Sequence, residues 1–267
     1  MKKIIGSLVL YNTQWEDLKI AVDSFFFSAP EAELHIWDNS PDTTLGNKLQ
    51  ADFGHRIRYK HSPQNIGYGS GHNQNFKNSQ GEYFCILNPD IVMSAATLPS
   101  LVRFTEANPK IGLVSCLIKS VDGSPQEVHK LMPSFKDYVV NTLRRFLKLQ
   151  ENQSQWQLVV TRKVAQYPMM SGCFMFFTRS HFEELQGFDE QFFLYFEDYD
   201  ISLRSFLLEK SAVVQDIAII HKWQRASHKH WKSFLTHSQS GLKFFNKWGF
   251  SSKTASRINM LTQSRNL

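Results

Sequence analysis

Short apolar runs alternate with longer amphipathic stretches through the first 118 residues of the chain. Strands are predicted for the runs rich in β-branched and aromatic residues, at 4–11, 34–37, 57–59, 83–87 and 111–118. Helices are predicted between them, at 13–28, 45–53 and 97–108, and after a glycine-rich loop at 67–71, up to 79. Thr13 and Glu16 have the spacing of a capping box for the first helix. Strands alternating with helices imply right-handed crossovers and predict an α/β fold with a mainly parallel sheet.

The pattern is looser after residue 118. Helices are predicted at 135–149, shortly after 180 and at 197–209, and the stretch at 152–157 is expected to be a polar connection. The run at 169–177 is apolar, and 212–220 predicts one or two strands that end at His221. No window approaches about 18 uninterrupted apolar residues, so we expect no membrane-spanning helix. Three cysteines stand singly in apolar runs, which favours buried, reduced thiols and a cytoplasmic protein.

Charge is distributed unevenly along the chain. The formal net charge is +6, yet residues 222–267 contain nine Lys and Arg and no acid. Aromatic residues interleave with these bases, so two interpretations stay open: a helical segment that packs its aromatic stripe on the core, or one that contacts an anionic membrane surface. In the second interpretation, the bases expected to meet lipid include Lys229, Lys232, Lys243 and Lys247. Nucleic-acid binding is a minor third alternative.

Polar clusters follow three of the predicted strands. They are Asp38-Asn39-Ser40, Asn88-Pro89-Asp90 and His221. Ligands of open α/β sheets bind outside the carboxyl ends of the strands. We therefore expect the three clusters to converge in space.

Four motifs in this order resemble the family 2 inverting glycosyltransferases, especially the bacterial rhamnosyltransferase-like group. The motifs are Asp38-Asn39-Ser40, the stretch at 65–73, Asn88-Pro89-Asp90, and the stretch at 187–204 with its acids and Arg204. The resemblance covers about residues 4–225 and implies a GT-A (Rossmann-like) fold. It places a nucleotide-binding half at about 1–118 and an acceptor-binding half at about 119–225. A basic, aromatic helical segment at 226–267 is expected to follow.

The resemblance implies a site for a nucleotide diphosphate sugar and a divalent cation, Mn²⁺ or Mg²⁺. Negative charge collects on the diphosphate as the sugar leaves, and a cation stabilises it. Asp90 and His221 match the family's metal ligands, while Asn88 stands where the family often has a second acid. The residues assigned to the donor nucleotide are Asp38, Asn39, Asn65, Gly67, Gly71, Asn73, Asn88 and Asp90. Asx or Pro-Asp turns remain alternatives for the aspartates, and a simple turn for the glycines.

The acids that open the predicted helix at 197 have different expected roles. Asp198 matches the family's general base, which takes the proton of the acceptor hydroxyl. Asp200 points about 200° away from Asp198 on a helix and can pair with Arg204 at i and i+4. Gly172 resembles the family's small-residue turn near the acceptor, and Glu197 is expected to support the site. Favourable charge at a helix N-terminus is the alternative for all three acids.

The resemblance further implies transfer of L-rhamnose from dTDP-L-rhamnose to a lipid-linked saccharide in O-antigen or capsule assembly. The enzyme would work peripherally on the cytoplasmic face of the bacterial cell membrane, and nucleic acid would not be a partner. Other donors, such as UDP-galactofuranose or UDP-GlcNAc, and a member that has lost activity stay open. A basic nucleic-acid-binding protein is the non-enzymatic alternative, but it leaves Asp90, Asp198 and His221 unexplained.

Overall fold

The computed structural model describes residues 3–147, 162–222 and 231–266. Over these ranges the chain forms one sheet in the order β3-β2-β1-β4-β8-β6-β9-β5, and β7 pairs with β9. The strands are β1 (Ile4–Leu10), β2 (Glu33–Asp38), β3 (Ile57–His61), β4 (Tyr83–Leu87), β5 (Ile91–Val92), β6 (Leu113–Lys119), β7 (Val164–Ala165), β8 (Phe174–Thr178) and β9 (Ser211–His221).

The α/β class agrees with the prediction, and the direction of the strands differs between the two halves of the sheet. β3, β2, β1 and β4 are parallel neighbours. β8 joins β4 and β6 in the antiparallel direction, β6 and β9 are parallel, and β5 and β7 are antiparallel to β9. Parallel neighbours need a crossover connection, and a helix separates each pair of successive strands from β1 to β4. The sheet is therefore parallel in its first half and mixed in its second.

The helices lie close to their predicted positions. They are α1 (Trp15–Ser28), α2 (Thr44–Phe53), α3 (Tyr68–Lys77), α4 (Thr97–Ala107), α5 (Phe135–Phe146), α6 (Arg179–Glu184), α7 (Glu197–Leu207), α8 (Trp231–Trp248) and α9 (Ser252–Asn266). The predicted capping box is wrong, because Gln14 is the N-cap of α1 and makes no side-chain capping bond. The last predicted residues of α5, 148–149, and the connection at 152–157 lie outside the described residues.

Helix α3 begins earlier than predicted. Gly67 precedes it with φ of +93°, and Gly69 and Gly71 lie inside its first turns. A Cβ on Gly69 would lie 2.8 Å from the Cβ of Phe188, and one on Gly71 would lie 2.7 Å from a methyl group of Val9. The two inner glycines therefore serve close packing of the helix, whereas only Gly67 of the three needs a left-handed backbone.

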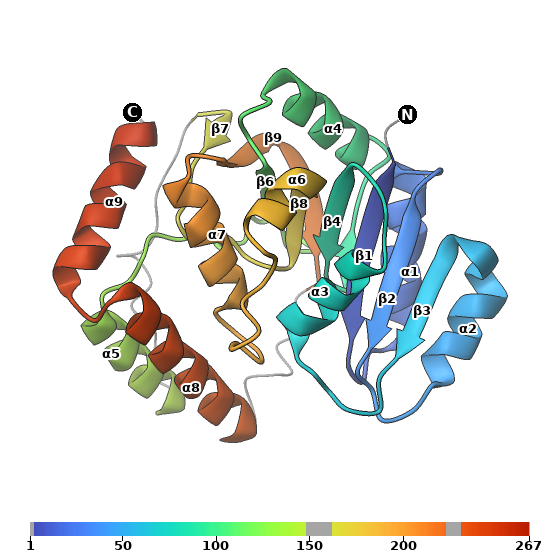
Figure 1. Ribbon diagram of the computed structural model, residues 1–267, viewed down its shortest axis with the longest axis horizontal. Coiled ribbons are helices and arrows are strands. Elements are labelled where there is room, and N and C mark those ends of the chain that lie inside the picture. Colours follow the sequence, from blue (N-terminus) through green and yellow to red (C-terminus); the bar gives the residue numbers. More distant parts are fainter. Residues whose placement is uncertain (1–2, 148–161, 223–230, 267) are drawn as a thin grey trace.

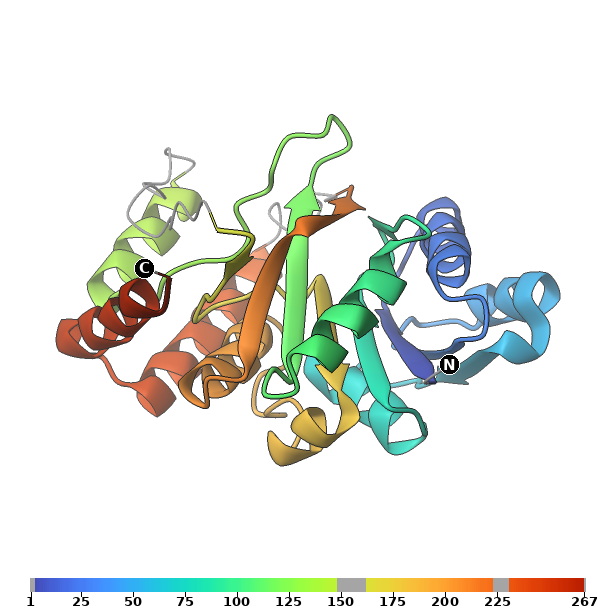
Figure 2. The same ribbon diagram turned by 90° about the horizontal axis from the view of Figure 1, so that it is seen from above.

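Apolar layers cover both faces of the sheet, and a third cluster lies beside it. α1 and α4 pack on one face, and α3 and α6 on the other. In Figures 1 and 2, helices α5, α8 and α9 gather at the end of the molecule opposite α2. Phe244 and Phe245 of α8 are buried in this third cluster, so part of the aromatic stripe packs on the core. The expected boundary at 225/226 falls in 223–230, outside the described residues.

The cysteines behave as the sequence predicts. Cys85, Cys116 and Cys173 are free and buried. Burial raises the pKa of all three thiols, which keeps them protonated and unreactive. Separately, within the residues that the structure describes, no helix combines the length and the apolarity needed to cross a bilayer.

Candidate functional site

The carboxyl ends of β2, β1 and β4 lie at one edge of the sheet. Leu10 pairs with Asp38 across β1 and β2, and Ser7 pairs with Ile86 across β1 and β4. Because neighbouring parallel strands end together here, the turns that follow β2 and β4 emerge at the same edge. β5 then pairs its Ile91 with His221, which brings the end of β9 to the turn that carries Asp90.

Asp90 and His221 contact each other at this edge. The His221 Nε2 lies 3.3 Å from the Asp90 Oδ1, and both side chains are mostly buried. Gln126 fixes the orientation of the imidazole: its Nε2 donates to the His221 carbonyl over 2.7 Å, so its Oε1 must face Nδ1, at 3.1 Å. That oxygen can only accept, which makes Nδ1 the donor and leaves Nε2 directed at Asp90.

This pair fits two ligands of a divalent cation. Ligands about 2.1 Å from a six-coordinate ion, at right angles to each other, lie about 3 Å apart, close to the observed 3.3 Å separation. A carboxylate oxygen and an imidazole held by an outer hydrogen bond suit Mn²⁺ or Mg²⁺. Among the described residues, no third His, Cys, Asp or Glu side chain joins this pair. Phosphate oxygens, water or other oxygen donors would complete the shell.

Tyr68 connects this edge with the turn before β8. Its hydroxyl lies 2.7 Å from the Gly172 carbonyl and 3.0 Å from the Asn88 Oδ1, and its one proton serves these two acceptors. The Gly172 N–H in turn donates to the Asp198 Oδ2 over 2.8 Å. A continuous chain of hydrogen bonds thus runs from the turn after β4 to the predicted base. The sequence analysis missed Tyr68, although it is the one large side chain among the glycines at 67–71.

Gly172 has room for no side chain. A Cβ there would lie 2.9 Å from the Cβ of Asp198. The absence of that carbon lets the main chain at 172 reach the carboxylate with its N–H. Glycine at position 172 therefore allows the main chain and Asp198 to approach closely, which is separate from its predicted role beside an acceptor.

The two acids at the start of α7 have raised pKa values. Burial raises the pKa of Asp198 to about 6, although the backbone N–H groups of Gly172 and Tyr199 lower it. Burial, and then the charge of Asp198, raises the pKa of the neighbouring Glu197 well above its usual range. Glu197 is 4% exposed and its Oε2 has no hydrogen-bond partner among the described residues. Burial thus favours the neutral form of Glu197, and a pKa near 6 suits Asp198 to proton transfer.

The turn before these acids has an unusual backbone. Tyr195 and Phe196 both have φ of +69°, in the left-handed region. Each such residue costs about 1–3 kcal/mol and persists only where the surroundings impose it. The ring of Phe196 contacts those of Tyr138, His237 and Phe244 at centroid distances of 5.2–5.5 Å. Aromatic packing thus stabilises the strained turn that presents Asp198.

Asp200 differs from Asp198 as the sequence predicts. It is fully buried, and its Oδ2 accepts from the Arg204 Nε over 2.9 Å. Arg204 also donates to the carbonyls of Leu185 and Gly187. The expected i, i+4 pair is therefore present, and it ties α7 to the loop that precedes it.

The side chains of the first polar cluster, Asp38-Asn39-Ser40, form hydrogen bonds within the protein. Asp38 is fully buried; its Oδ1 accepts from the Ser40 N–H and its Oδ2 from the Tyr59 hydroxyl, both over 2.8 Å. The Asx-turn geometry that the sequence left open is present. The Asn39 Oδ1 accepts from the N–H of Ile66, and its Nδ2 donates to the Gly67 carbonyl. Asn39 thus ties the loop before α3 to the end of β2.

The other predicted donor residues divide into two groups. Asn65 lies in the loop beside Asn39, and its Oδ1 accepts from the Gly67 N–H over 2.9 Å. Asn73 is buried farther along α3, where its amide pairs with the N–H and carbonyl of Phe188 and with the Glu190 carboxylate. Asn73, like Gly71, is engaged with protein neighbours, and the structure does not bring either to the Asp90–His221 pair through any of these contacts.

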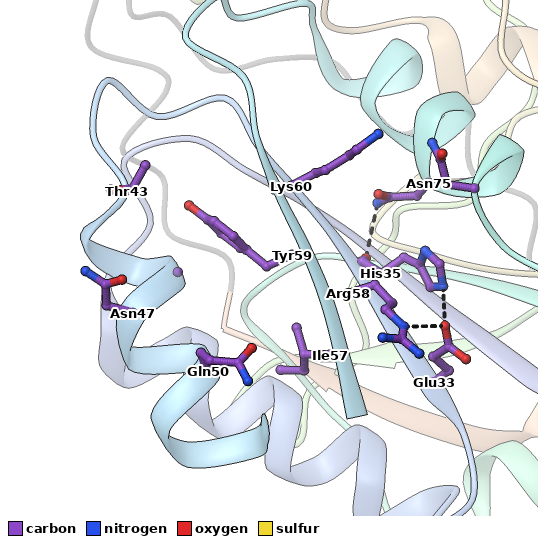
Figure 3. A pocket seen from close by; sticks show the side chains of 12 residues that line it. Glu33, His35, Thr43, Asn47, Gln50, Ile57, Arg58, Tyr59, Lys60 and Asn75 are labelled. Carbon is purple, nitrogen blue, oxygen red and sulfur yellow. Dashed lines mark hydrogen bonds and ion pairs between the residues drawn. The ribbon is translucent and has the colours of Figure 1, made fainter. Parts of the chain in front are cut away.

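A cavity of about 540 Å³ lies apart from this cluster, over β2, β3, α2 and α3. Figure 3 shows Tyr59 directed toward α2 and Lys60 toward Asn75 on α3. None of the predicted site residues lines it. The hydrogen bond from Tyr59 to Asp38 links the lining of this cavity to the sheet edge.

Residues 8–186, more than half of the chain, match the family described as Glycosyl transferase family 2. Rhamnosyltransferase WbbL of Escherichia coli (strain K12) is 26% identical over 147 residues, which cover 51% of this chain and 54% of WbbL. N-acetylglucosaminyl-diphospho-decaprenol L-rhamnosyltransferase of Mycobacterium tuberculosis (strain CDC 1551 / Oshkosh) is 24% identical over 164 residues, covering 55% and 52%. The chain spans about half the length of these curated relatives.

Similar solved structures cover almost the whole chain. GalNAc-T7 with UDP, GalNAc and Mn²⁺ superposes with a TM-score of 0.65 at 14% identity, covering 99% of this chain and 55% of that one. Mannosyltransferase PcManGT from Pyrobaculum calidifontis, in complex with GDP-Man and Mn²⁺, gives 0.58 at 16%, covering 98% and 75%. TarS 1-349 of S. aureus with UDP-GlcNAc gives 0.62 at 13%, covering 98% and 71%. At these identities the likeness establishes the fold, which is the GT-A fold that the motifs implied.

Proposed function

Because the chain belongs to glycosyl transferase family 2, we propose that it transfers a sugar from a nucleotide diphosphate donor to an acceptor hydroxyl, with inversion at the anomeric carbon. One observation carries the proposal. A chain of hydrogen bonds through Asn88, Tyr68 and Gly172 links the turn that carries Asp90 to Asp198. A donor end and a base end of one site are thereby set at a fixed separation.

At the donor end, Asp90 and His221 would bind Mn²⁺ or Mg²⁺, and Gln126 would keep the imidazole in the ligating tautomer. The cation would stabilise the negative charge that collects on the leaving diphosphate. Two of the similar structures contain Mn²⁺ together with a nucleotide or nucleotide sugar, which supports a cation here. Asp38 and Asn39, whose side chains are engaged within the protein, would support the end of β2 and the loop before α3 beside the nucleotide.

At the base end, Asp198 would accept the proton of the acceptor hydroxyl as its oxygen attacks the anomeric carbon. The attack comes from the face opposite the diphosphate, which departs with the electrons of the broken bond. A pKa of about 6 keeps Asp198 ionised at neutral pH and still basic enough to take the proton. Burial raises the pKa of Glu197 and favours its protonated form, which would leave this role to Asp198.

The favoured donor is dTDP-L-rhamnose, and the favoured acceptor is a lipid-linked saccharide of a surface polysaccharide such as O-antigen or capsule. The names of the relatives, a rhamnosyltransferase and a decaprenol-linked L-rhamnosyltransferase, support this assignment. UDP-galactofuranose and UDP-GlcNAc are the alternative donors.

The donor is tested by calorimetric titration and thermal shift with dTDP-L-rhamnose, UDP-GlcNAc and UDP-galactofuranose, each with Mn²⁺, Mg²⁺ or EDTA. A ligand that binds the folded state raises the midpoint of unfolding by mass action. We expect the largest shift with dTDP-L-rhamnose and Mn²⁺ or Mg²⁺, and NMR of the product should show an inverted anomeric centre. Binding of none of these donors, or a product with retained configuration, would contradict the proposal.

We further propose that the enzyme works on the cytoplasmic face of the cell membrane, in contact with anionic lipid. Lys243 and Lys247 are not available as first expected, because they bind the Gln191 carbonyl and the Asp189 carboxylate. Lys229 lies outside the described residues. The support now comes from exposed apolar side chains on α5, directly after it and on α8: Val140, Leu143, Leu147, Trp231, Leu235 and Leu242. Such apolar faces beside an acid-free basic segment suit an anionic interface.

Co-sedimentation with phosphatidylglycerol vesicles tests the membrane contact. Val140→Ser with Leu143→Ser should lower the bound fraction several-fold and leave transfer to a soluble acceptor analogue unchanged. Ile20→Ser on α1 is the matched control, because Ile20 is 41% exposed against 40% for Val140. Equal binding of both variants and the native chain would reject this surface.

A further inference from the structure

We infer that α8 positions the proposed base, and that Lys247 and Trp248 are its positioning residues, acting through Asp200 and the loop at 187–196. The inference rests on the proposed function, since it concerns how the base of that site is set. It gives the basic C-terminal segment a role in the reaction beyond contact with lipid.

Asp200 is the first point at which α8 reaches α7. The Asp200 Oδ1 accepts from the Trp248 Nε1 over 2.9 Å and from the Lys247 Nζ over 2.8 Å. Its Oδ2 is held by Arg204 from within α7. A fully buried carboxylate depends strongly on such partners, and this one lies two residues after Asp198. We therefore expect the removal of a donor from α8 to displace the first turn of α7.

The loop before α7 is the second point of contact. The Ser240 hydroxyl donates to the Leu194 carbonyl over 2.8 Å, and the Lys243 Nζ donates to the Gln191 carbonyl over 2.7 Å. The Lys247 Nζ reaches the Asp189 Oδ2 over 2.6 Å. Positions 240, 243 and 247 lie on one side of a helix, so a single face of α8 binds three successive points of the loop.

The strained turn is the third point. Phe196 has its ring against Phe244 and His237 of α8, and Tyr195 has its ring 5.3 Å from that of His237. Both residues keep left-handed backbones that an unsupported chain would leave. α8 thus fixes the conformation of the residues immediately before Glu197 and Asp198.

None of these contacts of α8 involves Asp90 or His221, the donor end of the proposed site. The polar contacts described for Lys247 and Trp248 go to Asp189 and Asp200, whereas Asp90 and His221 are held by β5, β9 and Gln126. A change at Lys247 should therefore reduce the rate of transfer and leave the affinity for the donor unchanged. A general loss of structure would reduce both.

The protonation of Asp198 reports its position. The groups that face it, besides the N–H groups of Gly172 and Tyr199, are Glu197, Lys130, Tyr68 and Cys173. Of these, the two N–H groups and Lys130 lower the pKa of Asp198. If α7 shifts and the bond to Gly172 lengthens, the ionised form loses a donor and the pKa of Asp198 rises. The acid limb of the rate profile should then move to higher pH.

Lys247→Met and Trp248→Phe test the inference in the full-length chain. We expect kcat to fall about tenfold in Lys247→Met and less in Trp248→Phe, with the donor Kd within twofold and the acid limb raised by half a pH unit or more. Lys247→Arg, which restores the donors to both carboxylates, should recover most of the rate. Lys253→Met, at an exposed position on α9, is the control and should match the native enzyme.

Carbon-detected NMR titration of the Asp198 carboxyl separates this inference from the proposed function. An unchanged pKa of Asp198 and an unchanged kcat in Lys247→Met, or in Trp248→Phe should the first variant fail to fold, would overturn the inference while transfer by the native chain upholds the function. A native chain that transfers no sugar would overturn the function. The titration would then still decide whether α8 sets the carboxylate, because that readout needs no turnover.

Discussion

The two ends of the proposed site are built in different ways. Asp90 and His221 lie at the ends of β-structure, where the pairing of Ile91 with His221 sets their separation. Asp198 follows two left-handed residues, and helices that are distant in the sequence hold that turn. The sheet edge fixes its residues by backbone register, whereas the base depends on side chains from α5 and α8. The donor end should therefore tolerate changes in the C-terminal helices, and the base end should not.

Asp198→Asn should break the base end alone. The amide cannot take the proton of the acceptor, so we expect kcat to fall about 10³-fold. The donor Kd should stay within twofold, because the donor end has no direct contact with this carboxylate in the described residues. Steady-state kinetics and calorimetry check both parts. Native-like turnover would remove Asp198 from its assigned role.

Asp90→Ala and His221→Ala should break the donor end alone. Loss of a metal ligand should weaken Mn²⁺-supported binding of the donor about 10²-fold, and without metal the variants and the native chain should bind alike. Titration with and without EDTA gives the comparison. If the native chain bound the donor equally well with and without metal, the cation site would be rejected.

Gln126→Leu sharpens the comparison at the donor end. Gln126 contacts His221 through both polar atoms of its side-chain amide, but it is not one of the two proposed metal ligands. Outer partners of this kind affect metal affinity about 10-fold. A weaker effect than that of His221→Ala, in the same titration, is the expected order. The reverse order would mean that His221 does not ligate.

Tyr68→Phe tests the connection between the two ends. It removes one buried hydroxyl and leaves Asn88 and the Gly172 carbonyl short of a donor, which costs about 1–3 kcal/mol of the free energy of unfolding. We expect a several-fold fall in kcat and a smaller rise in donor Kd. Denaturant unfolding measured beside the kinetics separates stability from rate. A rate equal to that of the native chain would show that the two ends are set independently.

The smallest expected effect is the change in the rate of transfer with pH around pH 6. Asp198 must be ionised to act, and burial raises its pKa to about 6. The rate should therefore rise with pH and be half-maximal near pH 6, and protonation should abolish the activity below that. Measurement of kcat/KM from pH 5 to 8 is the check. A flat profile across pH 6 would contradict a base with this pKa.

The sequence predicted which polar residues end the strands better than it predicted the contacts that hold Asp198. The positions of Asp38, Asp90 and His221 were predicted because turn residues mark strand ends and parallel strands end together. The contacts of Tyr68 with Gly172 and of Lys247 with Asp189 join residues 104 and 58 positions apart, and no local pattern records them. Lys243 and Lys247 were placed at a lipid surface for that reason. Thr13 was expected to cap α1 from the spacing of Thr13 and Glu16 alone. That spacing does not take into account the direction in which the chain leaves β1.

Burial of Glu197 has a further consequence for the electrostatics of the reaction. Two adjacent acids open α7, yet burial and the charge of Asp198 raise the pKa of Glu197 and favour its uncharged form. The proposed nucleotide diphosphate donor would arrive with negative charge of its own and gain more as its sugar departs. Repulsion by one neighbouring anion is weaker than repulsion by two, so an uncharged carboxyl lowers the electrostatic cost of admitting the substrate beside its base.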